Sequence, residues 1–418
     1  TVYAGGEFTQ ARPAGAPAGS SQTARANLLA YDIRTGQLIS SWVANTNGEV
    51  RVVRAAPDGS RLYVGGSFTQ VNGQTIRRIA ALNPTTGAPV ASFNPNPDAT
   101  VRAIAVTSGT VYFGGAFGSV GGQGRAKLAA ARVSDGAVLN WAPNAQGGDV
   151  WAMASSPDGG QVLAGGSFTS MNGSTNPGGG MASLDAVTGA NRPWAANRWI
   201  RYGGSGAAVT DLESDGSSVW VTGYTQSNGG GTLEGSARMS WNGGGIEWVE
   251  DCHGDSYGVT VQDEAVYVVS HHFYCGNVPG GFHQNEFRDW RRGLAFSRAT
   301  TQTLRAEAGR YGNWAGTPAP SLLPRFPRSA PGSHTRTSQR AWTIEGNSDY
   351  IVAGGEFPRV GGVAQQGLVR FAKKGVSGNP NDTGPQLGGS GANPTVTSPG
   401  PGEALVSWRT NFDPDNAN

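Results

Sequence analysis

The chain has 418 residues, of which 66 are glycine, 24 are proline and only 60 are charged (31 basic and 29 acidic). Glycine therefore makes up about 16% of the sequence (66 of 418), which excludes helical bundles and solenoids because glycine inside a helix costs about 1 kcal/mol. A net charge of +2 gives no reason to expect nucleic acid as a partner, and no run of 18 apolar residues exists to span a membrane. With 37 aromatic residues (12 Trp, 11 Tyr and 14 Phe), the composition indicates a folded all-β protein with many turns.

A short apolar string that ends in two glycines and an aromatic residue recurs along the chain. The clear copies are residues 2–8, 62–68, 111–117, 162–168 and 351–357, and weaker ones are 219–223 and 266–270. The first glycine, or the residue in its place, falls at positions 5, 65, 114, 165, 222, 269 and 354. These copies predict a repeated structural unit of about 50 residues.

Each unit contains four strand-like pieces separated by turns. In the second unit the pieces are residues 52–55, 62–68, 78–82 and 90–93, with turns at 57–59 and 84–87. Seven four-stranded units of this length predict a seven-bladed β-propeller, whereas a β-sandwich array would need a period of about 100 residues. Most units end in an aromatic residue, which we expect to wedge between neighbouring sheets: Trp42, Phe93, Trp141, Trp194 and Trp248.

The paired glycines and the Asp-Gly dipeptides have structural explanations. Phosphate-binding glycines lie between a strand and a helix, but no helix follows the glycines of this repeat. Bulges and close backbone approach explain them better. Asp58-Gly59 and Asp158-Gly159 are interpreted as turns rather than as sites of catalytic carboxylates.

The two ends of the chain differ from the repeat. The first unit begins at its Gly-Gly strand and the last has no obvious fourth strand, so we expect the propeller, residues 1–374, to be part of a longer chain. Residues 375–393 are rich in Gly, Ser, Pro and Asn and are interpreted as a linker. Residues 394–418 contain two alternating stretches, 394–397 and 404–408, that resemble the start of a fibronectin type III β-sandwich.

The Tyr-x-Gly-Gly-x-Phe strand, the Asp/Asn-x-x-Thr-Gly turn and the Phe93-Asn94-Pro95 ending resemble the delta-sixty-type β-propeller repeat of secreted bacterial proteins. The resemblance covers residues 1–374 and is strong in four or five of the units. In that family the propeller is often followed by fibronectin type III and lectin-like modules. The resemblance therefore implies architecture and an extracellular location rather than an activity.

The sixth unit is the irregular one. Residues 276–340 are interpreted as an insertion, in which ten arginines and three acids between 277 and 340 give a local charge of +7 (10 − 3). His253, His271, His272 and His283, the two cysteines and several aromatic residues also belong to this unit. A long loop inside a compact repeat is usually functional or disordered, so we place the candidate site here.

This region has three interpretations. The first is a Cys/His metal site, but Cys252 and Cys275 lack the spacing of zinc ligands and, in an exported protein, are expected to form a disulfide, so no metal site is predicted. Arginine and aromatic side chains suit a glycan that bears carboxylate or phosphate. The candidate ligand-binding residues are His271, His283, Trp290, Arg291, Arg292 and Trp314. In the third interpretation the loop only packs over one propeller face.

Two functions follow from these interpretations. The favoured one is a non-catalytic recognition or scaffold protein outside the cell that binds glycan or a cell-surface protein without a cofactor. The alternative is a propeller enzyme acting on an anionic polysaccharide, or a quinone-dependent dehydrogenase, with His253, Asp255 and His272 as acid and base groups. A quinone enzyme would also need a calcium site, for which no acidic loop is evident.

Overall fold

The computed structural model describes residues 1–13, 15–226, 229–284, 290–307, 313–323, 328–373 and 376, and the backbone of two short strands at 395–397 and 405–407. Within these residues the protein is all-β, and the one helical element is a single 3₁₀ turn, η1 (Ala195–Arg198). None of the described helical stretches has the length and apolar character needed to cross a membrane.

The Gly-Gly strings and their equivalents each form a strand of successive antiparallel sheets, and from the second sheet onward they are the second strand, as the repeat predicts. These strands are β1 (Val2–Gly5), β6 (Leu62–Gly66), β11 (Thr110–Gly115), β17 (Gln161–Gly166), β22 (Ser218–Thr225), β26 (Ala265–His272) and β32 (Tyr350–Gly355). From the second sheet onward, an inner strand precedes each of them. The inner strands are β5 (Val50–Ala55), β10 (Val101–Val106), β16 (Val150–Ser155), β21 (Ala207–Ser214), β25 (Ser256–Gln262) and β31 (Ala341–Gly346).

A third strand completes the hydrogen bonding on the other side of each Gly-Gly strand. The third strands are β4 (Leu28–Tyr31), β9 (Ile79–Leu82), β14 (Leu128–Arg132), β19 (Met181–Asp185), β23 (Ser236–Ser240), β27 (Arg291–Ser297) and β35 (Leu368–Ala372). The fourth strands are β20 (Asn191–Arg192), β24 (Ile246–Glu250) and β30 (Leu322–Leu323).

The expected fourth strand is reduced to one bridge in the first three sheets, at Leu38, Pro89 and Val138. In the second sheet the chain turns directly after this bridge, where the Phe93 N–H donates to the Val90 carbonyl at 3.0 Å. The last sheet contains three strands, β31, β32 and β35, in line with the missing fourth strand in its sequence.

Short two-stranded pairings accompany the larger sheets. Strands that follow one another in the chain pair as β2 (Gln10–Ala11) with β3 (Thr23–Ala24), β7 (Gln70–Val71) with β8 (Gln74–Thr75), β12 (Ser119–Val120) with β13 (Gln123–Gly124), β28 (Gln302–Thr303) with β29 (Pro318–Ala319), and β33 (Arg359–Val360) with β34 (Val363–Ala364). In a further pair, β15 (Ala145–Gln146) and β18 (Ser170–Met171) come together from either side of β16 and β17. The Asp-Gly turns are confirmed: Gly59 and Gly159 both have φ of +69°, and Asp58 and Asp158 accept backbone N–H groups of their own turns.

The expected aromatic wedges are confirmed. Trp42, Phe93, Trp141, Trp194 and Trp248 are each buried. Four of them meet an aromatic residue of the Gly-Gly strand in the same unit. The ring centroids are 5.3 Å apart for Tyr3–Trp42, 5.1 Å for Tyr63–Phe93, 5.0 Å for Tyr112–Trp141 and 5.1 Å for Trp220–Trp248. Edge and tilted ring contacts of this kind stabilise the sheets beyond their burial.

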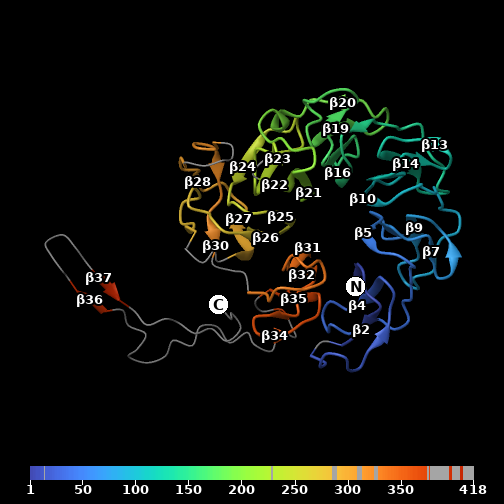
Figure 1. The fold of residues 1–418 in the computed structure, drawn as a ribbon, viewed down its shortest axis with the longest axis horizontal. Helices are drawn as coiled ribbons and strands as arrows, with labels where there is room; N and C mark the ends of the chain where they lie inside the picture. Colours follow the sequence, from blue (N-terminus) through green and yellow to red (C-terminus); the bar gives the residue numbers. More distant parts are fainter. Residues whose placement is uncertain are drawn as a thin grey trace.

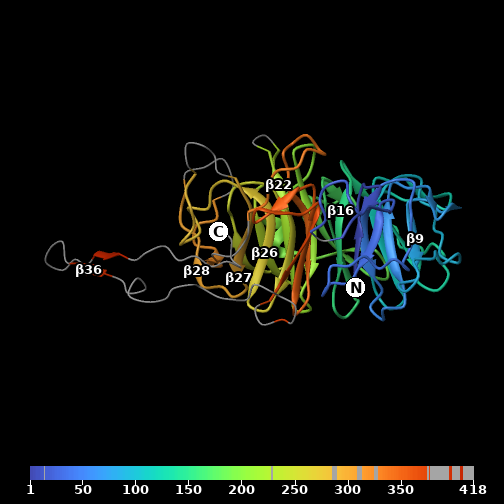
Figure 2. The same ribbon diagram turned by 90° about the horizontal axis from the view of Figure 1, so that it is seen from below.

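The sheets follow one another around a common centre, with the inner strands closest to it, and the structure is propeller-like (Figure 1). The first and last sheets are neighbours in space, because Val352 and Leu368 pack with Leu29 and Tyr31. A view from the side shows strands of the successive sheets running across the thickness of the molecule (Figure 2).

The part of the sixth unit expected to be an insertion contributes to the sheet itself. Strands β27 and β30 lie within residues 276–340 and are the third and fourth strands of that sheet. The apolar run at 294–296 is only three residues long and follows two arginines, so its strand pattern is hard to recognise. Beyond the propeller-like part, β36 (Thr395–Thr397) pairs antiparallel with β37 (Leu405–Ser407), while the rest of the expected linker and fibronectin-like start lies outside the described residues, apart from Val376.

Candidate functional site

Every inner strand, from β5 to β31, has a β-bulge near its start. The register of β5 against β6, for example, skips one residue between Val50 and Val52, and the other inner strands show the same shift. A bulge leaves one residue outside the ladder and re-aims its side chain, which is why bulges are frequent beside functional sites. We call the displaced residues the bulge residues: Arg51, Arg102, Trp151, Thr210, Tyr257 and Trp342.

Contacts between neighbouring sheets place bulge residues at the same end of the propeller. The Arg102 guanidinium lies 5.7 Å from the centroid of the Trp151 ring, and the Tyr257 and Trp342 rings are 4.8 Å apart. Burial lowers the pKa of Arg102, and the nearby positive charge of Arg51 lowers it further. The Arg51 side chain is 42% exposed and Trp342 is 38% exposed, so this end of the inner strands presents cationic and aromatic groups to solvent.

A polar network joins the bulge residue Tyr257 to the sixth sheet. The Tyr257 hydroxyl lies 2.9 Å from His271 Nδ1 and 3.2 Å from Asp255 Oδ2, and it accepts a hydrogen bond from Gln339 Nε2 at 2.7 Å. Burial raises the pKa of Tyr257, and the Asp255 carboxylate adds to that rise. Burial lowers the pKa of His271 although Asp255 opposes this, so the imidazole of His271 is a neutral hydrogen-bonding group near pH 7.

Several of the predicted ligand-binding residues meet around the ring of Trp290. The His271 ring is 4.9 Å from it and the Phe273 ring 5.3 Å, and the Arg292 guanidinium lies 5.6 Å from its centroid. Arg292 Nη1 also donates a hydrogen bond to Gln339 Oε1 at 2.8 Å. Through Gln339 this group is continuous with the Tyr257 network.

Other predicted ligand-binding residues lie at the edge of this group or outside it. Arg291 stacks on Phe282, with 3.8 Å between guanidinium and ring centroid, and exposed His283 packs against Tyr274. Trp314, in contrast, is only 8% exposed within a core cluster, and its indole N–H donates to the Thr232 carbonyl at 3.0 Å. Packing therefore accounts for Trp314, and the structure does not bring it to the exposed group.

The alternative catalytic residues have three different sets of partners. His253 Nε2 lies 2.8 Å from Glu307 Oε1, while Asp255 belongs to the Tyr257 network. His272 is completely buried, and its ring nitrogens lie 2.7 Å from the Ser270 hydroxyl and 3.1 Å from the Ser256 hydroxyl. A fully buried imidazole cannot reach a polysaccharide, so the trio does not form one acid–base site in this structure.

A buried carboxyl group accompanies His272. Glu250 Oε1 lies 3.4 Å from His272 Nε2, and both side chains are fully buried. Burial raises the pKa of Glu250 to about 8 and lowers that of His272, so both groups are neutral at pH 7. The pair is thus a hydrogen-bonding element of the interior rather than an ion pair.

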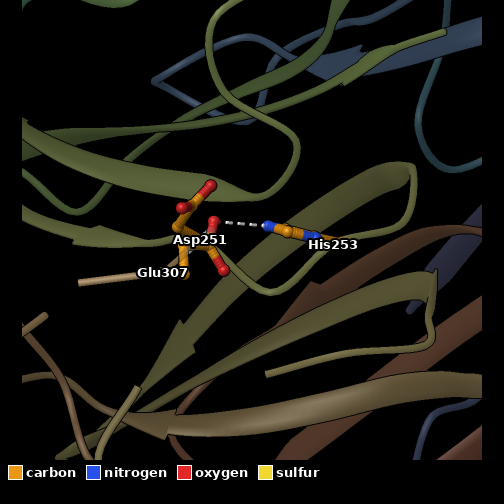
Figure 3. Close-up of side chains that lie close together, drawn as sticks. All are labelled: Asp251, His253 and Glu307. Atoms are coloured by element: carbon orange, nitrogen blue, oxygen red, sulfur yellow. Dashed lines mark hydrogen bonds and ion pairs between the residues drawn. The ribbon is translucent and has the colours of Figure 1, made fainter. Parts of the chain in front are cut away.

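The predicted disulfide between Cys252 and Cys275 is confirmed, and it joins the connection after β24 to the segment after β26. The residues on either side of Cys252, Asp251 and His253, come close to Glu307. One ligand atom from each of the three lies within 4.8 Å of the others (Figure 3). The cysteine sulfurs are bonded to each other and so cannot ligate a metal, but this second group has the residue types of a metal site, which was not predicted from the sequence.

The structure also reveals site residues that sequence reasoning missed. Trp151, Tyr257 and Trp342 each occupy the second position of the observed inner strand, where an apolar residue would be expected to point inward. Large aromatic residues recurring at this one position were the available signal. The bulge shifts the alternation of side chains by one residue, but it is not visible in the sequence. The recurring aromatic residues therefore resemble ordinary core packing.

A scan against protein-family models finds no match, and neither does a search of curated protein sequences. Among solved structures, a chain from the crystal structure of a mitotic checkpoint complex has a TM-score of 0.47 and 10% sequence identity, and the match covers 83% of each chain. The fold and the disulfide define an all-β, propeller-like protein with an internal Cys252–Cys275 bridge.

Proposed function

We propose that this protein is a non-catalytic recognition or scaffold propeller that works outside the cell. It binds an anionic glycan at the bulge residues and at the side chains that surround Trp290. In this proposal the successive sheets are the seven blades of a closed ring. The packing of Val352 and Leu368 on Leu29 and Tyr31 supports closure between the last blade and the first. The similarity to delta-sixty-type repeats and the start of a fibronectin type III module belong to the same proposal.

One observation carries the proposed function: arginine and aromatic side chains recur at the bulged positions of successive sheets. Aromatic faces stack on the apolar faces of sugar rings, and the guanidinium fork matches a carboxylate with two parallel hydrogen bonds. The Arg102–Asp149 ion pair, at 3.7 Å, is too long for a hydrogen bond, so Arg102 retains donors for a ligand. These groups favour a polysaccharide that contains uronic acids.

The disulfide supports the proposed location. Disulfides persist in oxidising compartments and are rare where glutathione keeps thiols reduced. Cys252 and Cys275 are both fully buried, and no free cysteine occurs in the chain. Thiol titration of the denatured protein, isolated from its natural source with alkylating agent present, should therefore detect less than one free thiol per chain, and two would contradict the proposed location.

Binding to an array of neutral and uronic-acid oligosaccharides, followed by calorimetry, tests the proposed function. We expect Trp342→Ala and Trp290→Ala each to weaken binding of a uronic-acid ligand about tenfold or more, equivalent to about 1.4 kcal/mol. The matched control is Trp199→Ala, because Trp199 is 59% exposed and also carries a stacked arginine, Arg198 at 5.2 Å, but lies beside η1.

Each outcome of this experiment separates the alternatives. Equal losses in Trp199→Ala and Trp342→Ala would show non-specific binding and contradict the assigned surface. Binding to cell-surface protein but to no glycan would reject the glycan class. Progressive shortening of the polysaccharide in the same samples would instead favour the enzyme alternative.

A further inference from the structure

Three metal-binding side chains meet beside the disulfide. Asp251 and His253 lie in the connection between β24 and β25, and Glu307 lies after β28. The His253 Nε2 atom is 2.8 Å from Glu307 Oε1, and the ligand atoms of all three residues are within 4.8 Å of one another. Figure 3 shows the two carboxyl groups close together at the edge of the imidazole ring.

The site is buried and rich in negative charge. Asp251 is 0% exposed, and the side chains of His253 and Glu307 are 10% and 8% exposed. Two carboxyl groups held together away from water are costly unless a cation or protons neutralise them.

Unmatched oxygen atoms are the second observation that points to a cation. Asn277 donates from Nδ2 to Asp251 Oδ2 at 2.9 Å, and this amide is itself 2% exposed. Among the described residues, however, no donor meets Asp251 Oδ1 or Asn277 Oδ1, although both atoms are buried. Such oxygens normally have a hydrogen-bond donor or a metal ion as partner, so two orphan acceptors on one hydrogen-bonded pair are unusual.

We propose that Asp251, His253 and Glu307 bind one divalent cation of the zinc type. An imidazole nitrogen with carboxylate oxygens is a donor set used for Zn²⁺, whereas Ca²⁺ takes oxygen ligands only. Three protein ligands leave a coordination position for a fourth group. On binding, His253 Nε2 exchanges its contact with Glu307 for the metal, and the neutral imidazole carries its proton on Nδ1.

The position of the site gives the cation a structural role. Cys252 stands between two of the ligands, and its disulfide reaches Cys275, so the cation and the disulfide fasten adjacent parts of the sixth sheet. The cation additionally attaches Glu307 and the segment around it. The His253 ring also packs on Phe273 and Tyr274, with centroids 6.1 and 5.0 Å away. The inference is independent of the proposed glycan binding.

Calorimetric titration of the full 418-residue chain, after EDTA treatment and dialysis, tests the proposal with Zn²⁺, Mn²⁺ and Ca²⁺ as probes. We expect one Zn²⁺ per chain, with Mn²⁺ weaker and Ca²⁺ weakest, and a rise in Tm with Zn²⁺ concentration. His253→Gln and Glu307→Gln should each weaken Zn²⁺ binding about tenfold or more. Asp255→Asn is the matched control, because this carboxylate is close in sequence but belongs to the Tyr257 network, and it should bind Zn²⁺ like the wild type.

Near-UV circular dichroism of each metal-free variant identifies any that do not fold. Glu307→Gln preserves shape and size, so it keeps the test decisive if His253→Gln fails to fold. Three results would overturn the proposal: no one-to-one Zn²⁺ binding to the wild type, tighter binding of Ca²⁺ than of Zn²⁺, or wild-type Zn²⁺ affinity in folded Glu307→Gln. Elemental analysis of protein purified without chelator gives an independent measure of the bound metal.

Discussion

The first glycine of the Gly-Gly pair is required by contact with the next sheet. A Cβ on Gly65 would overlap Val101, and one on Gly114 would overlap Val150, in each case a residue of the following inner strand. These glycines have ordinary negative φ values, so packing rather than backbone conformation excludes a side chain. Sheets can therefore approach more closely at this position than a β-branched residue would allow.

This contact predicts that Gly114→Ala destabilises the protein by about 2 kcal/mol, because the added methyl group must displace Val150 or Met153 in a packed core. The control is Gly109→Ala in the turn of the same hairpin, where a Cβ would meet no atom within 4 Å and φ is not positive. That variant should be neutral or slightly more stable. Urea unfolding gives the free energy of unfolding of each variant. Equal values for Gly114→Ala and Gly109→Ala would show that the neighbouring sheets accommodate the added methyl group at no cost.

The elements of the molecule were predicted unequally well from the sequence. The Gly-Gly strands and their turns were predictable, because the repeated apolar strings and glycine positions are local signals. Strand β27 was not, because Arg291 and Arg292 at its start match a charged loop better than a strand. The bulges were also missed, since a register shift depends on the partner strand and has no consistent local signature.

The candidate site shows the same division. Trp290 and Arg292 were predicted because aromatic and arginine residues are concentrated in the sixth unit, and the structure brings them together. Trp314 met the same criterion but is in the core, since residue type alone does not report burial. The Asp251–His253–Glu307 group could not be predicted from spacing, because 54 residues separate its histidine from its glutamate.

At the scale of elements, the disulfide is the covalent connection within the sixth sheet. It closes a loop with a sequence separation of 23 residues that includes β25 and β26. We expect the double variant Cys252→Ala with Cys275→Ala to lose about 3 kcal/mol of stability, chiefly because the unfolded chain is no longer constrained. Urea unfolding of the wild type with and without reductant provides the comparison, and a reductant effect that persists in the double variant would assign the loss to another cause.

The whole molecule is held at its centre by charges from sheets far apart in sequence. Arg54 of β5 forms ion pairs with Glu345 of β31, at 2.8 Å, and with Glu213 of β21, at 3.6 Å. These contacts join the second, fifth and last sheets, so their inner strands come together at one centre. Asp211, also on β21, adds a third carboxyl group to this single arginine.

The central charge cluster predicts how stability changes with pH. Burial and the negative charges of Glu345, Asp211 and Asp215 together raise the pKa of Glu213 to about 8, although the Arg54 guanidinium opposes the rise. Because the folded state binds this proton more tightly than the unfolded chain, the contribution to stability is complete below pH 4.5 and is lost as pH rises through 8. Burial likewise raises the pKa of Asp211, to about 6, so its contribution is lost at lower pH.

Replacing Glu213 with glutamine mimics the protonated carboxyl group at every pH. We expect the Tm of Glu213→Gln to match the wild type near pH 4.5 and to exceed it by about 2 °C or more at pH 9, a modest value because the Glu213 side chain is 27% exposed. Glu264→Gln, an exposed carboxylate beside the turn between β25 and β26, controls for the general effect of removing a charge and should follow the wild-type curve. Calorimetric scans from pH 4.5 to 9 compare the three proteins. A wild type that becomes more stable relative to Glu213→Gln as pH rises would mean that attraction to Arg54 outweighs burial and carboxylate repulsion among the inner strands.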